Sequence, residues 1–312
     1  MKKKIIEKKR SKKIFTIDAY TACYLANDKV LQFLNNVTYK DGFNGNFNLH
    51  RIDNPNGIYD NLIMVNLQNP NNMKYMHYGD LYYSEKRKDK KGNVYVWFKI
   101  VNKALYTPIT PIRKNASILS LMPIITQELN LRLNNVTTCD IACDSYVNFS
   151  KKIKKAILDE NLLPILNRKP YYDINEKLPE LRFSFDTNQV RMNNIAIILK
   201  QKTKDGGFDL KGYDKEQEIE VSEKDYIRDW TEMKSVKRIE LHLKKEQMKE
   251  LLKNPLMQKY FDGCDSITSE MLLPYLADSN SDFLENVFYH FLNRLIYFKD
   301  KTTGKKITVF DL

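Results

Sequence analysis

Residues 136–144 read VTTCDIACD, an alternation that predicts a β-strand. Successive side chains of a strand point to opposite faces, so this stretch has one apolar face and one face with carboxylates. The apolar face, which is expected to be buried, holds Cys139, Ile141 and Cys143. Asp140 and Asp144 share the other face with a small alanine between them. A core strand that carries two carboxylates predicts a polar site beside the sheet.

Asp140 and Asp144 need partners, because an unpaired carboxylate beside a core costs free energy. A divalent cation or an arginine would serve. At roughly 3.3 Å per residue, the two carboxylates of a regular strand lie about 13 Å apart, too far to share one ion. Asp140 is therefore the candidate ligand. Asp144 either caps the helix that follows or, as the favoured alternative, merely ends the strand.

Residues 236–243, VKRIELHL, predict a second strand whose polar face carries Arg238, Glu240 and His242. Glu240 and His242 are two residues apart, about 6.6 Å along a strand, so their side chains can converge on one cation. A carboxylate with an imidazole suits Mn²⁺ better than Mg²⁺. The alternative is an edge strand with ordinary surface charges.

Residues 210–218, LKGYDKEQE, place Tyr213 and Lys215 on one face if the segment is extended. A tyrosine can attack phosphorus when its proton is removed and the phosphate charge is neutralised. Lys215 would supply positive charge near that phosphate. The alternative is that Tyr213, one of 19 tyrosines, is an ordinary packing or surface residue.

The remaining patterns mix strands and helices without regular βαβ alternation. This favours an α+β fold with a largely antiparallel central sheet flanked by helices and a helical C-terminal extension. The boundaries we expect are a basic tail at 1–13, a core at 14–253 and the extension at 254–312. Predicted strands cover 14–25, 82–83, 94–101, 181–186 and 192–201, and predicted helices cover 28–36, 117–130, 149–162 and 282–298.

Charge favours an anionic partner, because 51 Lys and Arg against 39 Asp and Glu leave a formal net charge of +12 in 312 residues. Nucleic acid and an acidic membrane surface both fit. Much of the excess lies in the N-terminal tail, which would hold phosphates loosely or stay solvated. Its candidate contacts are Lys2, Lys3, Lys4, Lys8, Lys9 and Arg10.

Several classes lose their usual sequence support. The tail has no apolar stretch after it, so it is not expected to be a signal peptide. The sequence also lacks a run of about 18 apolar residues, which a membrane-spanning helix would need. The four cysteines form no CxxC pair, and reduced thiols in a cytoplasmic protein are the simplest interpretation. P-loop, GxGxxG and GxSxG motifs are missing from the sequence.

Four blocks in this order resemble a known family: NKALYT at 102–107, TTCDIACD, GYDKEQE and KRIELHL. They are similar to blocks of the rolling-circle replication initiators of small plasmids, the Rep-trans group, and of the gene II type initiators of filamentous phages. The resemblance covers roughly residues 95–253. Thr137 or Thr138 stands where the family usually has Arg, and the chain has no His-hydrophobe-His pair.

The resemblance implies a nicking-endonuclease-like core and a metal-dependent enzyme that cuts one strand of origin DNA. Tyr213 would form a 5′-phosphotyrosine and release a 3′ hydroxyl, with Lys215 stabilising the charge on phosphorus. Mg²⁺ or Mn²⁺ would be held by Asp140, Glu240 and His242. Arg238 and the tail would contact single- or double-stranded DNA, and a host helicase and polymerase would act next.

Two other functions remain open at this point. One is a DNA-binding protein of a phage or plasmid that keeps the fold without the chemistry. The other is a metal-dependent nuclease that uses water in place of Tyr213.

Overall fold

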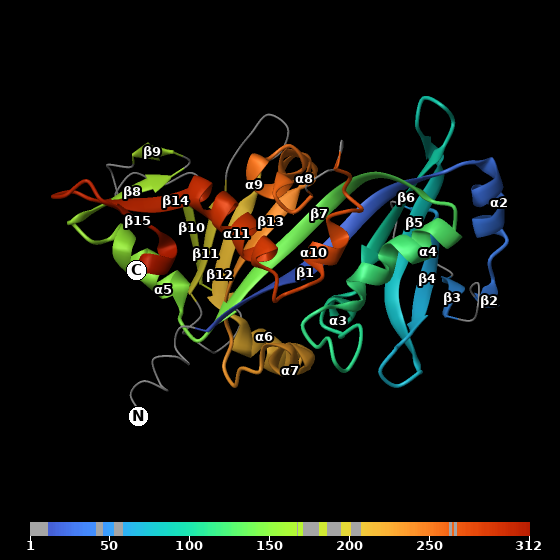
Figure 1. Ribbon diagram of the computed structural model, residues 1–312, viewed down its shortest axis with the longest axis horizontal. Helices are drawn as coiled ribbons and strands as arrows, with labels where there is room; N and C mark the ends of the chain where they lie inside the picture. Colours follow the sequence, from blue (N-terminus) through green and yellow to red (C-terminus); the bar gives the residue numbers. More distant parts are fainter. Residues whose placement is uncertain are drawn as a thin grey trace. The chain divides into compact units, whose positions relative to one another are not determined.

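The computed structural model describes a mixed α+β protein in which helices flank antiparallel strands (Figure 1). Antiparallel pairing holds for every strand pair whose register is given. The expected fold class is thus confirmed. The described residues are 12–41, 46–52, 59–166, 168–170, 181–185, 195–200, 207–261, 264 and 267–312.

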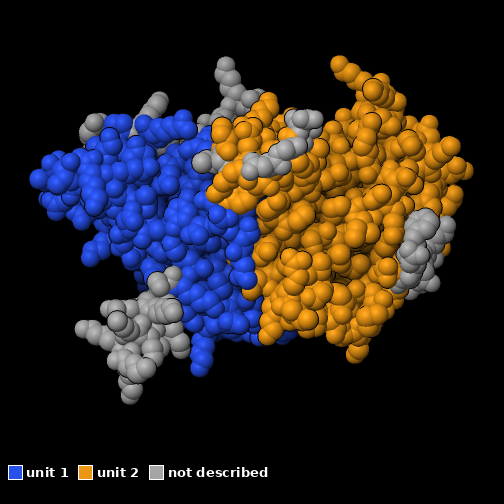
Figure 2. Space-filling model, in the orientation of Figure 1, with its two compact units in different colours: residues 1–16, 140–247, 280–312 blue, residues 17–139, 248–279 orange. Residues whose placement is uncertain are grey.

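The chain divides into two compact units, coloured separately in Figure 2. Unit 1 comprises residues 1–16, 140–247 and 280–312, and unit 2 comprises residues 17–139 and 248–279. The long strands β1 (Lys13–Ala26) and β7 (Arg132–Ser145) each pass from one unit into the other. This division departs from the contiguous boundaries expected at 13 and 253, because each unit is assembled from segments far apart in the sequence.

Unit 2 is built on neighbouring strands in the order β1-β6-β5-β4-β3-β2. The strands that follow β1 are β2 (Tyr39–Asp41), β3 (Phe47–Ile52), β4 (Asn61–Gln68), β5 (Tyr75–Lys88) and β6 (Val94–Ile100). The helices are α2 (Asp28–Asn35), α3 (Asn102–Leu105), η2 (Ile118–Leu121), α4 (Met122–Glu128), α9 (Pro255–Gln258) and α10 (Leu273–Leu276). Helix α8 (Lys245–Leu252) begins in unit 1 and continues into unit 2.

The strands of unit 2 have one buried face and one partly exposed face, as the period of two requires. In β4, Ile63, Val65 and Leu67 are buried and alternate with half-buried residues. The buried Tyr78 of β5 donates its hydroxyl to carbonyl groups of η2, at 3.3 Å from Ile118 O. Helices α3, α4 and α10 contact η2 in turn. The apolar faces of these short helices therefore complete the core of unit 2.

Unit 1 contains neighbouring strands in the order β10-β11-β12-β13-β7, and a smaller sheet in the order β15-β14-β8-β9. The strands are β8 (Leu162–Leu166), β9 (Lys169–Pro170), β10 (Leu181–Phe185), β11 (Ile195–Lys200), β12 (Asp209–Asp214), β13 (Lys237–Lys244), β14 (Ile296–Asp300) and β15 (Lys306–Ile307). The helices are α5 (Phe149–Ile157), α6 (Lys215–Ser222), α7 (Tyr226–Thr231), α11 (Asp282–Leu295) and η3 (Val309–Asp311).

Helices α5 and α11 pack on β12 and β13 in unit 1. Helix α11 supplies a row of fully buried side chains at helical spacing, including Phe288, Phe291 and Leu292. The ring of Phe291 meets that of Phe208 edge-on, with centroids 5.2 Å apart. The predicted apolar face of β7 is confirmed as buried, because Cys139, Ile141 and Cys143 are each fully covered.

Two predicted helical stretches contain strands instead. Helix α5 ends at Ile157, and the chain then forms β8, although a helix was expected to 162. Helix α11 ends at Leu295, and β14 and β15 follow, so the C-terminal stretch is not purely helical. β8 pairs with β14, and each strand finds its partner in a distant part of the sequence. Local periodicity cannot show that pairing.

No helix in the described part of the chain has both the length and the apolar character needed to cross a bilayer.

Candidate active site

Strands β12 and β13 bring the polar residues of two separate sequence blocks onto one face. Their antiparallel register pairs Tyr213 with Arg238, Lys211 with Glu240, and Asp209 with His242. Because paired residues of neighbouring strands point to the same side, all six side chains share one face of the sheet. The two blocks predicted to act together are therefore adjacent.

The hydroxyl of Tyr213 lies between a carboxylate and an ammonium group. It donates a hydrogen bond to Glu240 Oε2 at 3.0 Å and accepts one from Lys215 Nζ at 3.3 Å. Tyr213 is half-buried, whereas Glu240 is only 5% exposed and Lys215 only 1%. A phenol between a proton acceptor and a cation is an arrangement that can form and stabilise a phenolate. The structure thus brings together three of the predicted site residues.

Lys215 reaches Tyr213 by a different route from the one expected. Strand β12 ends at Asp214, and Lys215 is the first residue of α6, so the segment is not extended through both residues. Asp214 caps this helix by accepting a hydrogen bond from the backbone N–H of Glu216. The turn into the helix places the lysine ammonium 5.5 Å from the centre of the Tyr213 ring.

Glu218 holds the buried ammonium group of Lys215 in place. Its carboxylate accepts from Lys215 Nζ at 2.8 Å and from Lys224 Nζ at 2.7 Å. Burial opposes ionisation of Glu218, but the two lysines outweigh it, and the pKa of this carboxyl lies below its usual value. Glu218 was not among the predicted site residues. Its signal is the spacing of three from Lys215, which puts both on one helix face once a helix is recognised.

The other acidic residues of the GYDKEQE block fasten α6 to its surroundings. Asp214 forms an ion pair with Lys237 at the start of β13. Glu216 accepts from Arg228 Nε at 2.7 Å and from the backbone N–H of Val236 at 2.9 Å. These bonds position the end of β12, and hence the tyrosine.

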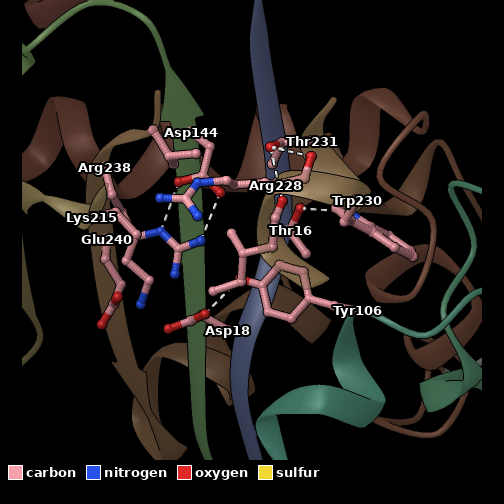
Figure 3. A network of polar contacts seen from close by, with 12 residues as sticks. Thr16, Asp18, Tyr106, Asp144, Lys215, Arg228, Trp230, Thr231, Arg238 and Glu240 are labelled. Carbon is pink, nitrogen blue, oxygen red and sulfur yellow. Dashed lines mark hydrogen bonds and ion pairs between the residues drawn. The ribbon is translucent and has the colours of Figure 1, made fainter. Parts of the chain in front are cut away.

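Arg238 and Asp144 form a buried ion pair (Figure 3). Arg238 Nε donates to Asp144 Oδ1 at 2.7 Å, and the second nitrogen donates to Oδ2 at 2.6 Å. Both side chains are fully buried, so Arg238 does not reach a DNA backbone as was expected. Asp144 is not a helix cap either, because Asn148 caps α5 by accepting from Lys151 N. The pair is structural and joins β13 to β7.

Asp140 and His242 form a second pair across the same two strands. The imidazole Nδ1 lies 2.5 Å from Asp140 Oδ1. This hydrogen bond raises the pKa of His242 above its ordinary value, although partial burial acts in the opposite direction. Both side chains keep some exposure. The aspartate therefore has the cationic or hydrogen-bonding partner that its position on a core strand requires.

The three predicted cation ligands do not form one cluster. Across the described ranges, no three His, Cys, Asp or Glu side chains come close enough together to hold a metal ion. Glu240 is bonded to Tyr213, and Asp140 is bonded to His242. Their donor types suit Mg²⁺ or Mn²⁺, but their grouping does not fit a three-ligand site.

The opposite side of β12 explains why glycine precedes the tyrosine. A Cβ added at Gly212 would collide with the hydroxyl of Ser150 on α5 and crowd the side chain of Ile239. Helix α5 can approach β12 closely because residue 212 has no side chain. Close packing on this side fixes the strand that carries Tyr213 on the other.

The NKALYT block, in unit 2, makes a structural contact. The hydroxyl of Tyr106 lies 2.5 Å from Asp18 Oδ1 of β1 (Figure 3). The amide nitrogen of Asn102 lies 3.1 Å from the same oxygen. Asp18 was not singled out from the sequence. The bonds tie α3 to β1 and explain the block as a packing motif of unit 2.

The predicted tail contacts Lys2, Lys3, Lys4, Lys8, Lys9 and Arg10 lie outside the described residues, as do residues 186, 192–194 and 201 of the predicted strands. Lys13 belongs to β1, not to the tail, and its Nζ donates to the Tyr289 hydroxyl at 2.8 Å. Lys12 donates to the Thr231 carbonyl at 3.0 Å.

No protein-family model and no curated protein matches the chain. Among solved structures, the chain is similar to the rolling circle replication initiator protein from Geobacillus stearothermophilus. The TM-score is 0.47 and the identity 11%, and the match covers 96% of this chain and 94% of that one. At this identity and score, the similarity assigns no function and no residue role to this chain.

Proposed function

We propose that this protein is a replication initiator that nicks one DNA strand at an origin through a tyrosine nucleophile. The observation that carries the proposal is the Tyr213 hydroxyl held between Glu240 and Lys215. A purely structural tyrosine needs one hydrogen-bond partner, whereas a nucleophile needs a proton acceptor and a cation. Tyr213 has both, and it keeps partial exposure.

In the proposed reaction, the Tyr213 oxygen attacks the scissile phosphorus and its proton passes to Glu240. The bond from phosphorus to the 3′ oxygen breaks, and the departing oxygen takes up a proton to become a free 3′ hydroxyl. The strand is left with its 5′ phosphate on Tyr213. Lys215 stabilises the extra negative charge on the phosphoryl oxygens. The bond energy is conserved, so a later 3′ hydroxyl can reverse the step and rejoin the strand without ATP.

The proposed reaction implies two host partners that act after the nick. The free 3′ hydroxyl would be extended by a host polymerase while a host helicase separates the strands. We also propose a cytoplasmic location, where the cysteines would stay reduced.

A divalent cation is a separate proposal, with Asp140, Glu240 and His242 as its candidate ligands. Such an ion would supply neutralising charge at the phosphate. Support comes from their shared sheet face, and the pairing of each with another residue weighs against it. Titrating Mn²⁺ into wild type and Asp140→Asn by calorimetry tests the proposal. We expect wild type to give a heat of Mn²⁺ binding that is lost in the variant. No binding heat in wild type would contradict the cation proposal, and Lys215 alone would then neutralise the phosphate charge.

The decisive experiment for Tyr213 is a covalent adduct assay on single-stranded DNA that contains the origin. Wild type is expected to give a protein–DNA adduct that resists denaturation, and Tyr213→Phe none. Tyr75→Phe is the matched control, because it changes an exposed tyrosine of unit 2. Equal adduct in wild type and Tyr213→Phe, or none in either, would overturn the proposal.

The same assay separates the two alternatives. Hydrolytic cleavage that survives in Tyr213→Phe would indicate a nuclease that activates water. Origin binding without cleavage by any variant would indicate a DNA-binding protein that keeps the fold alone. Glu240→Gln tests the proton acceptor, because it keeps the shape and the hydrogen bond but loses basicity. We expect it to lower the adduct rate by about 10²-fold to 10⁴-fold.

A further inference from the structure

The less buried face of the unit 2 sheet carries a cluster of four aromatic rings, the aromatic patch, formed by Tyr59, Tyr82, Tyr95 and Trp97. The ring centroids of Tyr59 and Trp97 are 5.2 Å apart, those of Tyr59 and Tyr82 5.6 Å, and those of Tyr95 and Trp97 5.9 Å. All four side chains are partly exposed. Rings that remain open to solvent in contact with one another form a platform.

Strand geometry aims these rings outward. In β6, the buried Val94, Val96 and Phe98 alternate with Tyr95 and Trp97. Tyr82 of β5 is paired with Trp97, so it faces the same side. The helix-covered core of unit 2 therefore lies on the opposite face, and the aromatic residues contribute little to it. Core packing does not account for four large rings on this side.

Positive charge accompanies the rings. The guanidinium carbon of Arg87 lies 5.5 Å from the ring centre of Tyr59 and 6.0 Å from that of Trp97. An irregularity in the β5–β6 register between Tyr83 and Lys88 allows Arg87 to turn toward this face. Beyond it, residues 85–91 of the hairpin carry five basic and two acidic residues.

The other end of the patch has mixed charge. Lys99 of β6 is exposed and is paired in register with Asp80 of β5. Asp80 accepts from the Tyr82 hydroxyl at 3.3 Å and lies 2.7 Å from His77 Nε2. The carboxylate is thus engaged by neighbours, and Lys99 balances its charge. The patch as a whole has a basic side at Arg87 and a near-neutral side at Asp80.

We propose that the aromatic patch binds single-stranded DNA, with bases stacked on Trp97 and Tyr95 and phosphates beside Arg87 and Lys99. Every base has a π-face, so stacking on aromatic side chains holds an unpaired strand of any sequence. The choice of DNA over RNA rests on the proposed nicking function, because an initiator must hold a strand that is no longer paired. A second copy of the chain fits less well, since it would bring a second basic side at Arg87 to the contact, and like charges repel.

The two tryptophans of the chain allow a direct test. Trp230 is largely buried in unit 1, where its indole N–H donates to Thr16, so Trp230→Phe leaves Trp97 as the sole tryptophan. Adding an oligo(dT) strand of about 12 nucleotides should quench Trp97 fluorescence as bases stack on it. Binding measured by anisotropy without any quenching would overturn the proposal.

Variants locate the binding energy. Trp97→Ala and Tyr95→Ala should each weaken oligo(dT) binding by about tenfold. Trp97→Phe should restore most of that loss, because it returns an aromatic ring to the patch. The control is Tyr75→Ala, an exposed tyrosine on β5 seven residues from Tyr82. Equal losses in Trp97→Ala and Tyr75→Ala would sink the proposal.

Arg87→Ala and Lys99→Ala probe the phosphates. Each should lower the slope of log K against log salt by about 0.7, the value for one single-strand phosphate contact. Sedimentation tests whether a second copy of the chain binds the patch instead. A wild-type dimer that is lost in Trp97→Ala, with oligo(dT) binding unchanged, would assign the patch to a second copy. Failure here and failure of the nicking proposal are distinguishable, because Trp97 quenching requires no adduct and the Tyr213 adduct assay requires no quenching.

Discussion

Each unit covers one sheet face with helices and uses the other face differently. In unit 1 the face of β12, β13 and β7 carries charged side chains, and two pairs of them bridge β13 and β7, Arg238 with Asp144 and His242 with Asp140. In unit 2 the less buried face of β5 and β6 carries aromatic rings. Paired charges fix the geometry that chemistry needs, whereas open rings suit a partner that slides or varies in sequence.

The comparison is testable because each unit contains one of the two tryptophans. A Trp97→Phe background reports unfolding of unit 1 through Trp230. A Trp230→Phe background reports unfolding of unit 2 through Trp97. Substitutions of the paired charges in unit 1 should change the unfolding seen by Trp230. Substitutions of the aromatic rings in unit 2 should change DNA binding more than they change the unfolding seen by either tryptophan.

The largest expected effect comes from breaking the buried pair of unit 1. Asp144→Asn leaves the Arg238 guanidinium in the interior without its counter-charge and should cost about 3–5 kcal/mol of unfolding free energy. Urea unfolding followed through Trp230 measures it. The control is Asp140→Asn, which weakens the more exposed pair with His242 and should cost about 1 kcal/mol or less.

A double variant keeps this prediction testable if Asp144→Asn does not fold. Asp144→Leu with Arg238→Met replaces the pair with apolar side chains and should recover most of the stability. Equal costs for Asp144→Asn and Asp140→Asn would show that burial of the first pair has no energetic weight.

Gly212→Ala tests the tight packing behind Tyr213. The new Cβ would collide with Ser150 on α5, and such overpacking costs about 1–3 kcal/mol. The substitution should also lower the adduct rate, because it displaces the strand that carries Tyr213. Adding Ser150→Gly removes the colliding group and should restore part of both losses. If Gly212→Ala alone behaves as wild type, close approach of α5 does not position the site.

Much of the site could be predicted from the sequence because strand periodicity is local. The pattern of VKRIELHL put Arg238, Glu240 and His242 on one face, and the register confirms it. Partner choice could not be predicted, since it depends on which strands become neighbours. The sequence separated Asp140 from Asp144 but named neither partner: Asp140 pairs with the partly exposed His242, and Asp144 pairs with the buried Arg238.

The same limit applies to the fold. Most strands and helices followed from local patterns, although β8 and β14 did not. The split into discontinuous units depends on β1 and β7, which extend through both. The aromatic patch shows the limit most clearly. Tyr59, Tyr82, Tyr95 and Trp97 come from separate segments, and only the pairing of β5 with β6 brings their rings together.

Tyr106→Phe in unit 2 should have a moderate effect on stability and none on the proposed chemistry. It removes the hydroxyl that donates to Asp18, a loss of about 1.5–3 kcal/mol for a hydrogen bond to a charged group. Unfolding followed through Trp97 should report the loss, while the Tyr213 adduct rate stays unchanged. A lost adduct with stability intact would contradict the structural role of the NKALYT block and assign it to catalysis.

The smallest expected effect is a pH dependence in unit 1. Lys215 and Lys224 lower the pKa of Glu218 in the folded protein despite its burial, so the ionised carboxylate stabilises the fold at neutral pH. This contribution is fully present above the unfolded-state pKa, near 4.3, and is lost as pH falls through the lower folded-state value. Since the carboxylate is about one-third exposed, we expect it to be worth about 0.5 kcal/mol.

Glu218→Gln should therefore reduce the free energy of unfolding at pH 7 and make that free energy fall less steeply in acid. Urea unfolding followed through Trp230 measures both effects. Glu223→Gln, an exposed carboxylate just beyond the end of α6, is the matched control and should leave the acid limb unchanged. Identical acid limbs in wild type and Glu218→Gln would show that this carboxylate does not hold Lys215 in the folded protein.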